Sequence, residues 1–526
     1  MTGPYQIPRP YLLALTFVAA LGGCLDYTVG AIPVEIFPIA KFHYAYCHVF
    51  VGALLILDRE GAWRRRLIGL VALVVAGLAI GYLMHDIADR VRRREVIALL
   101  FEAPAFYWWI AGLWLAAPLL TRERPDKTRR GPWLPWGMGL LLLYGTLCLA
   151  GALASSRPET SLYTYYQERA VYIAVLAGWV RAAERDEEFL RLSGLVVAWT
   201  LGALMAVSAA INLIDLFGGE AVRARFVQWG FVYAKADMAI HEIPKRRILF
   251  PMLHFNRAAY WAMIGMMAML VAARTAAGRR RWLALALAAA GFWIVAQTYT
   301  RGIAVAAIAG AFIWVATISR RALLATAAVA ILGAVVVPTT FTRQMKTVFD
   351  PQTYMVNQPP ITSMKTRMMA WGWSLETIGD HPWTGLGYGR KITRRAYEQY
   401  VFTEGSAEAR KSLSGTDEMG HMHNLWLETM VENGIPAGLA LLGFCVVRWA
   451  ALLLVWRRGA LFDRGIAGAW LAMEAALFIA GMIFFMVKMN HGLLTLAVWV
   501  YCLAWVAGAM ERIAADPLSE PINPSV

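Results

Sequence analysis

The segment HMHNLWLETMVENGIPAGL places imidazoles and carboxylates at the start of a long apolar run. Glu428 and Glu432 follow Asn424 at four-residue intervals, so all three share one helix face. An imidazole at the mouth of an apolar cavity accepts a proton near neutral pH, which makes His423, rather than His421, a candidate general base. Two alternatives stay open: a helix-capping cluster without chemistry, and a metal site that uses both imidazoles.

Arginines next to apolar blocks point to an anionic ligand. Arg301 lies in QTYTRGIAVAAIAG, between two apolar blocks, and Arg257 opens another block in HFNRAAYWAM. An arginine near the membrane interior is costly, so it is a functional candidate by default. The planar guanidinium fork suits a diphosphate because it binds two oxygens at once and stays charged. A salt bridge to a nearby carboxylate or a snorkelling end residue is the structural alternative.

The elements that must position these residues are membrane helices. Of the 526 residues, 59% are hydrophobic and only 16% are charged. The apolar residues come in blocks of roughly 17–25, the length that crosses a bilayer core. The sequence therefore predicts an all-α, polytopic transmembrane bundle of about 12–14 helices. The five cysteines lie inside or beside apolar blocks and indicate no disulfide framework.

The predicted spans divide the chain into four parts. We expect about eleven N-terminal transmembrane helices in 1–338, a periplasmic loop domain in 339–423, C-terminal transmembrane helices in 424–510 and a cytoplasmic tail in 511–526. The individual spans are expected near 11–30, 44–57, 67–84, 96–120, 134–153, 166–180, 192–217, 257–273, 282–299, 302–318, 322–338, 424–455, 466–487 and 492–510.

The distribution of basic loops orients the bundle. Alternating helices put basic loops such as 121–130 and 274–281 on one side, which the positive-inside rule makes cytoplasmic, and both termini join that side. The short basic loop 86–95 disagrees with this alternation. The outer loops 219–256 and 339–423 are also basic, which suits phosphates or anionic lipid head groups.

The long outer loop has internal order. Residues 363–379 read as an amphipathic helix whose apolar stripe is Met368, Trp371, Leu375 and Ile378, and this stripe is expected to pack on the membrane domain. The following GLGYG does not indicate a nucleotide loop, because it follows a helix rather than a strand. Its glycines favour close passage of the backbone past a ligand or another helix.

Three motifs taken in order resemble the O-antigen ligase/O-antigen polymerase superfamily. They are TRG at a helix start, then RMMAWGWSLETIGDHPWTGLGYG, then HMHNLWLETMVENGIPAGL. The resemblance covers about 290–445, whereas the first 250 residues match only in hydropathy. This sequence departs from the family pattern at Ala437, where a glycine is usual, and in an extended outer loop at about 391–420.

The resemblance implies a bacterial inner-membrane glycosyltransferase of the GT-C type with a large helical periplasmic loop. Such an enzyme transfers a glycan from an undecaprenyl-diphosphate carrier to an acceptor hydroxyl at the periplasmic face, here expected to be lipid A–core. By resemblance, Arg301 and Arg367 hold the diphosphate, His423 activates the acceptor, and Glu432 has a structural or orienting role.

Four further residues complete the predicted site. Arg257 and Arg390 are added as diphosphate ligands, and Asn424 and Trp371 as supporting residues. No nucleotide cofactor is expected, because the carrier diphosphate is already a good leaving group, and no metal is expected, because several converging arginines make it dispensable. No nucleic-acid partner is expected. The alternatives are an O-antigen polymerase, a protein O-oligosaccharyltransferase and, in a different class, a lipid-linked glycan transporter. We see no clear repeat between halves of the chain, and the ionisable cluster lies at the outer mouth, both of which disfavour transport.

Overall fold

The computed structural model describes part of the chain. The described residues are 133–165, 169, 187–228, 232–234, 246–248, 255–298, 300–319, 321–324, 363–403, 422–482 and 489–515. His421, the four expected spans before residue 133 and the span at 166–180 apart from Arg169 lie outside them, as does nearly all of the span at 322–338.

Apolar helices dominate the described part and confirm the all-α membrane class. Among the described residues, five helices are long and apolar enough to cross a membrane: α6, most of α9, α11, α20 and α21. The predicted boundaries hold to within a few residues in most cases. The bounds are α6 Trp133–Ala154, α9 Glu187–Phe217, α11 Phe255–Thr275, α12 Gly278–Gln297, α13 Arg301–Ala316, α20 Leu425–Arg458, α21 Leu461–Gly481 and α22 Met489–Ala515.

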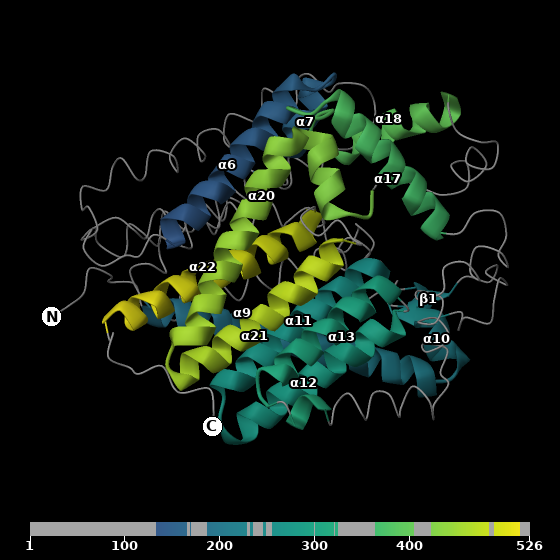
Figure 1. Cartoon of the computed structure of the whole chain (residues 1–526). Coiled ribbons are helices and arrows are strands. Elements are labelled where there is room, and N and C mark those ends of the chain that lie inside the picture. The colour runs from purple at the N-terminus through teal and green to yellow at the C-terminus, as the bar shows by residue number, and fades with distance from the viewer. Residues whose placement is uncertain are drawn as a thin grey trace, which may run out of the picture.

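The helices form one packed bundle (Figure 1). Helix α11 contacts α9, α12, α13 and α21, and α20 contacts α6, α21 and α22. Buried alanines line the facing sides of α13 and α21, among them Ala304 and Ala307 on α13 and Ala472 and Ala476 on α21. Small residues let helix backbones approach closely, which replaces the hydrophobic driving force that is missing between helices in lipid.

A buried ion pair ties α20 to α21 inside the bundle. The Arg448 guanidinium donates through Nε and Nη2 to the two carboxylate oxygens of Glu474, each at 3.0 Å. A third N–H of Arg448 donates to the Phe444 carbonyl at 3.2 Å, and the guanidinium lies over the Phe444 and Trp499 rings. Both charged side chains are almost fully buried, so each charge is stabilised by the other instead of by water.

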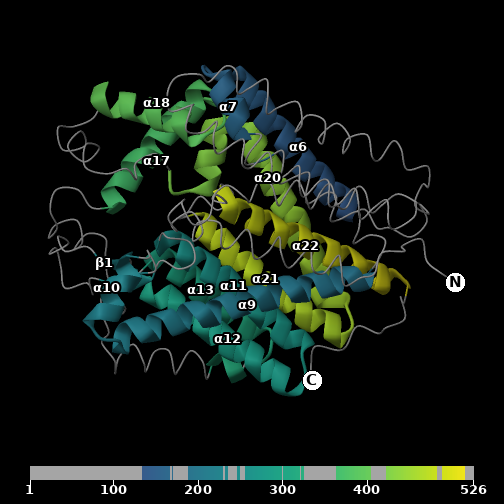
Figure 2. The same cartoon turned by 180° about the vertical axis from the view of Figure 1, so that it is seen from behind.

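The remaining elements lie outside the spans. They are α7 Pro158–Tyr165, α10 Glu220–Gln228, α17 Ser363–Asp380, α18 Arg390–Thr403 and the strands β1 Val232–Ala234 and β2 Arg246–Ile248. The two strands pair antiparallel within the outer loop 219–256, where no strand was expected. Helices α7, α17 and α18 lie together at one end of α6 and α20, as the two opposite views show (Figures 1 and 2).

The predicted apolar stripe of α17 is wrong in part. Ile378 is buried, but the side chains of Met368 and Leu375 are exposed. The buried face instead carries Ala370 and Trp373, and the Trp373 ring meets the ring of Tyr397 on α18 edge to face at 5.2 Å. Both stripes follow a three- and four-residue period, so periodicity alone does not say which one is buried.

Candidate functional site

The backbone corner before α20 holds His423 in an unusual conformation. His423 has φ = 50°, and among the described non-glycine residues it alone has a positive φ. On one side, the indole N–H of Trp371 on α17 donates to the Met422 carbonyl at 2.8 Å. On the other side, the Asn424 side chain caps α20 by accepting the N–H groups of Trp426 and Leu427. The corner is fixed from both sides, so a left-handed histidine that costs about 1–2 kcal/mol persists.

Two sequence-predicted supporting residues therefore have direct structural roles. Trp371 joins the outer loop to the residue before His423, and Asn424 supplies the N-cap that starts the helix. The capping alternative holds for Asn424, whereas His423 makes no part of that cap and is half-buried beside it.

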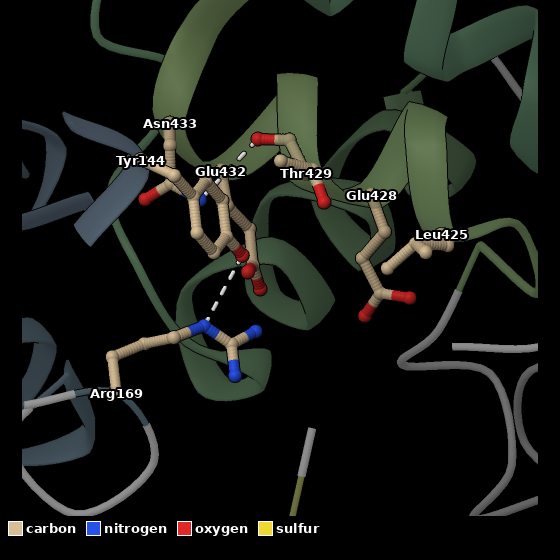
Figure 3. Close-up of a pocket in the computed structure, with 7 residues that line it drawn as sticks. All are labelled: Tyr144, Arg169, Leu425, Glu428, Thr429, Glu432 and Asn433. Carbon is tan, nitrogen blue, oxygen red and sulfur yellow. Dashed lines mark hydrogen bonds between the residues drawn. The ribbon is translucent and has the colours of Figure 1, made fainter. Parts of the chain in front are cut away.

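Below this corner lies a small pocket with a cavity volume of about 10 Å³, which is roughly the space that one water molecule needs. It is lined from α6 by Tyr144, from the segment after α7 by Arg169, and from α20 by Leu425, Glu428, Thr429, Glu432 and Asn433. Figure 3 shows the carboxyl groups of both glutamates and the Arg169 guanidinium directed into this space. The prediction that the two glutamates share one helix face is confirmed, and both side chains are buried.

Arg169 is the site residue that the sequence analysis missed. Its side chain is 2% exposed, and its Nε donates to the Tyr144 hydroxyl at 3.2 Å. The guanidinium also lies 5.1 Å from the ring centroid of Tyr388 in the GLGYG segment. The available signal was an ionisable residue within a predicted membrane span, ERAVYIAVLAGWV, which by default marks a functional position.

The GLGYG segment is held by the region around Arg169. The Ser161 hydroxyl of α7 donates to the Tyr388 carbonyl at 2.7 Å, and the Tyr165 ring meets the Tyr388 ring edge to face. Burial raises the pKa of Tyr165, so this phenol stays neutral across the physiological range. Segments more than 200 residues apart in the chain thus meet at one tyrosine.

A kink in α20 receives the same segment. Pro436 has no N–H to give to the Glu432 carbonyl, and the Ile435 N–H donates to the Pro382 carbonyl at 2.7 Å. The carbonyls of Val431 and Glu432, which lose their helical partners there, accept the N–H groups of Leu386 and Gly387 at 2.8 and 3.0 Å. The expectation that the glycine segment passes close to another helix is confirmed, and the loop satisfies the polar groups that the kink exposes.

Gly434 at the kink has φ = 81°, and a Cβ there would collide with the Trp383 carbonyl. Gly434→Ala is therefore expected to destabilise the protein by about 1–3 kcal/mol and to detach loop 382–387. The measurement is thermal unfolding in detergent. Gly443→Ala in the same helix is the matched control, because its new methyl meets only ordinary contacts with Leu140. An unchanged unfolding temperature for Gly434→Ala would contradict this account of the kink.

The predicted diphosphate ligands Arg257 and Arg301 stand at neighbouring helix starts. Arg301 is the first residue of α13, Arg257 lies in the first turn of α11, and the Thr300 hydroxyl donates to the Asn256 side chain at 3.2 Å. A helix N-terminus carries partial positive charge, and each of these two neighbouring starts also carries an arginine. Such a region favours an anion.

Fewer contacts are described for the other two predicted diphosphate ligands, Arg367 and Arg390. Arg367 is half-buried on α17, which packs against α20. Arg390 begins α18, and its side chain lies outside the described atoms. The Arg257–Arg301 region and the His423 corner are carried by different helices, and their convergence on one substrate stays a prediction.

Metal independence also stays a prediction. Within the described ranges, no group of three or more His, Cys, Asp and Glu side chains is arranged to hold a metal ion. The two-imidazole alternative involves His421, which lies outside those ranges.

These elements form a membrane protein with a buried polar pocket near one end of its helix bundle. Residues 286–442, which run from α12 through the first half of α20, match the family model described as O-antigen ligase. The match covers the same region in which the motifs resemble the O-antigen ligase/O-antigen polymerase superfamily, so it supports that resemblance. No curated protein matches the chain.

Proposed function

We propose that the protein transfers O-antigen glycan from undecaprenyl diphosphate to a lipid A–core hydroxyl at the periplasmic face of the inner membrane. The observation that carries the proposal is the fixed His423 corner, which lies inside a region matching the O-antigen ligase model. A half-buried imidazole held in a strained backbone is pre-organised, and pre-organisation is what a general base requires.

In this mechanism the acceptor oxygen attacks the anomeric carbon of the carrier-linked sugar. A new C–O bond forms while the bond from that carbon to the diphosphate oxygen breaks, and the electron pair leaves with the diphosphate. His423 takes the acceptor proton. Arg301 and Arg367, with Arg257 and Arg390, stabilise the negative charge that develops on the diphosphate, and such charge stabilisation is usually the largest catalytic effect.

The pocket residues have a positioning role in this proposal. Arg169 contacts Tyr144 on α6 and Tyr388 in the outer segment, and it shares the pocket with Glu428 and Glu432 on α20. A buried guanidinium opposite two buried carboxylates fixes the direction in which the first turns of α20 point. Those turns carry His423 at their start.

A deletion strain tests the function. Loss of all polymer attached to lipid A–core, with carrier-linked polymer retained, is expected on a lipopolysaccharide gel. A single attached repeat would instead identify a polymerase, and an unchanged profile would reject both activities.

Transfer by the purified protein is expected to survive chelation, and a loss that a divalent ion restores would contradict metal independence.

A further inference from the structure

Helix α17 has a second apolar face in addition to the one it buries. Met368, Gly372, Leu375 and Gly379 recur at four- and three-residue steps, so they form one stripe along the helix. The side chains of Met368 and Leu375 are 50% and 63% exposed, and a methyl group added at either glycine would meet open space. We call these four residues, together with Trp383 beyond the helix end, the outer apolar face.

Trp383 lies beside an exposed apolar part of α20. Its side chain is 75% exposed, and the neighbouring Pro382 carbonyl accepts the N–H of Ile435 at 2.7 Å. Ile435 and Leu439 are themselves exposed at the start of the apolar part of α20, a candidate span. Trp383 is therefore adjacent to exposed apolar side chains of a candidate span.

We propose that the outer apolar face lies on the bilayer and that its partner is lipid at the boundary between head groups and acyl chains. Helix α17 is too polar to span a membrane, but an exposed apolar stripe on a polar helix suits the interfacial layer. Tryptophan is enriched in this layer because its ring is apolar and its N–H is polar. A face continuous with the surface of a span meets lipid without any movement of the helix.

Charge identifies the kind of lipid. Beside the C-terminal half of the stripe, the exposed charged side chains are Glu376 and Asp380, which do not attract anionic head groups, whereas Lys365 and Arg367 belong to the N-terminal half of the helix. The contact made by Leu375 and Trp383 is therefore expected to be apolar and to form with zwitterionic lipid.

This placement has a consequence that rests on the proposed function. Arg367 directly precedes Met368 on α17, so a helix lying on the leaflet holds that guanidinium at head-group level. The diphosphate of a polyprenyl carrier occupies the same level, because its chain is in the hydrocarbon and its glycan is in water.

Site-directed spin labelling of the full chain tests the contact without an activity measurement. Cys24 and Cys47 are replaced by Ser so that they do not react with the label. Cys148, Cys445 and Cys502 are kept, because they are buried. Nitroxides are attached to Leu375→Cys and Trp383→Cys, with Glu376→Cys as the control on the next residue of α17. Each variant is reconstituted in lipid nanodiscs, and collisions with oxygen, which partitions into lipid, are compared with collisions with a water-soluble nickel chelate.

Labels at 375 and 383 are expected to collide several-fold more with oxygen relative to nickel than the label at 376. Equal nickel access at 375 and 376 would overturn the proposal in favour of a water-exposed face. Shielding of 375 from both reagents would overturn it in favour of cover by protein. The preference is expected in phosphatidylcholine alone, and its appearance only with added phosphatidylglycerol would refute an apolar contact. Failure of the glycosyltransferase assay leaves these readouts unaffected.

Discussion

His423→Ala is expected to lower the rate of glycan transfer by about 10²–10⁴-fold, the contribution that a positioned general base typically makes. The donor is bound by arginines in this mechanism, so its apparent affinity is expected to change little. The measurement is single-turnover transfer by purified protein with carrier-linked glycan, together with a binding assay for the donor.

The control separates chemistry from backbone conformation. Asparagine tolerates the left-handed region that His423 occupies, so His423→Asn keeps the corner but removes the base. It is expected to be as inactive as His423→Ala while unfolding at the wild-type temperature. Near-normal transfer by His423→Asn would remove the base assignment and leave a purely structural role for the corner.

Breaking the buried ion pair is expected to have the largest effect on stability. Glu474→Leu leaves the Arg448 guanidinium buried without its carboxylate, which costs about 3–5 kcal/mol in comparable interiors. The same loss is expected for Arg448→Met. The free energy of unfolding in detergent, supported by the amount of protein that accumulates in the membrane, measures both effects.

Two comparisons show whether the cost comes from an unpaired charge. The double variant Arg448→Met with Glu474→Leu removes both charges and is expected to recover most of the loss. Arg394 and Glu398 form a partly exposed pair at i,i+4 on α18, and Arg394→Gln is expected to cost less than about 1 kcal/mol. A double variant as unstable as the single ones would indicate that shape, rather than charge, holds these helices together.

The sequence predicted those features that depend on local patterns. Apolar blocks predicted the spans because every backbone polar group in lipid must be satisfied within its own helix. The four-residue spacing placed Glu428 and Glu432 on one buried face, and the polar-to-apolar change at Asn424 marked the start of α20. The assignment of His423, the arginines and Glu432 to one catalytic site stays a prediction.

The features that sequence did not predict depend on contacts between distant segments. Nothing near Arg169 in the chain shows that Tyr144 and Tyr388 will surround it. The period of α17 fits two apolar stripes, and only the packing of α18 and α20 determines which of them is buried. Pro436 predicts that a carbonyl loses its partner, but not which outer-loop N–H replaces that partner.

The exchange of hydrogen bonds at the α20 kink has a consequence for protein engineering. The carbonyls of Val431 and Glu432 and the N–H groups of Leu386 and Gly387 satisfy one another, so neither segment is a self-sufficient module. A chimaera that takes 382–389 from one protein and 431–436 from another is expected to leave some of these backbone groups without hydrogen-bond partners, because its loop and its kink come from different structures. The natural unit of exchange includes both segments, although about forty residues of chain lie between them.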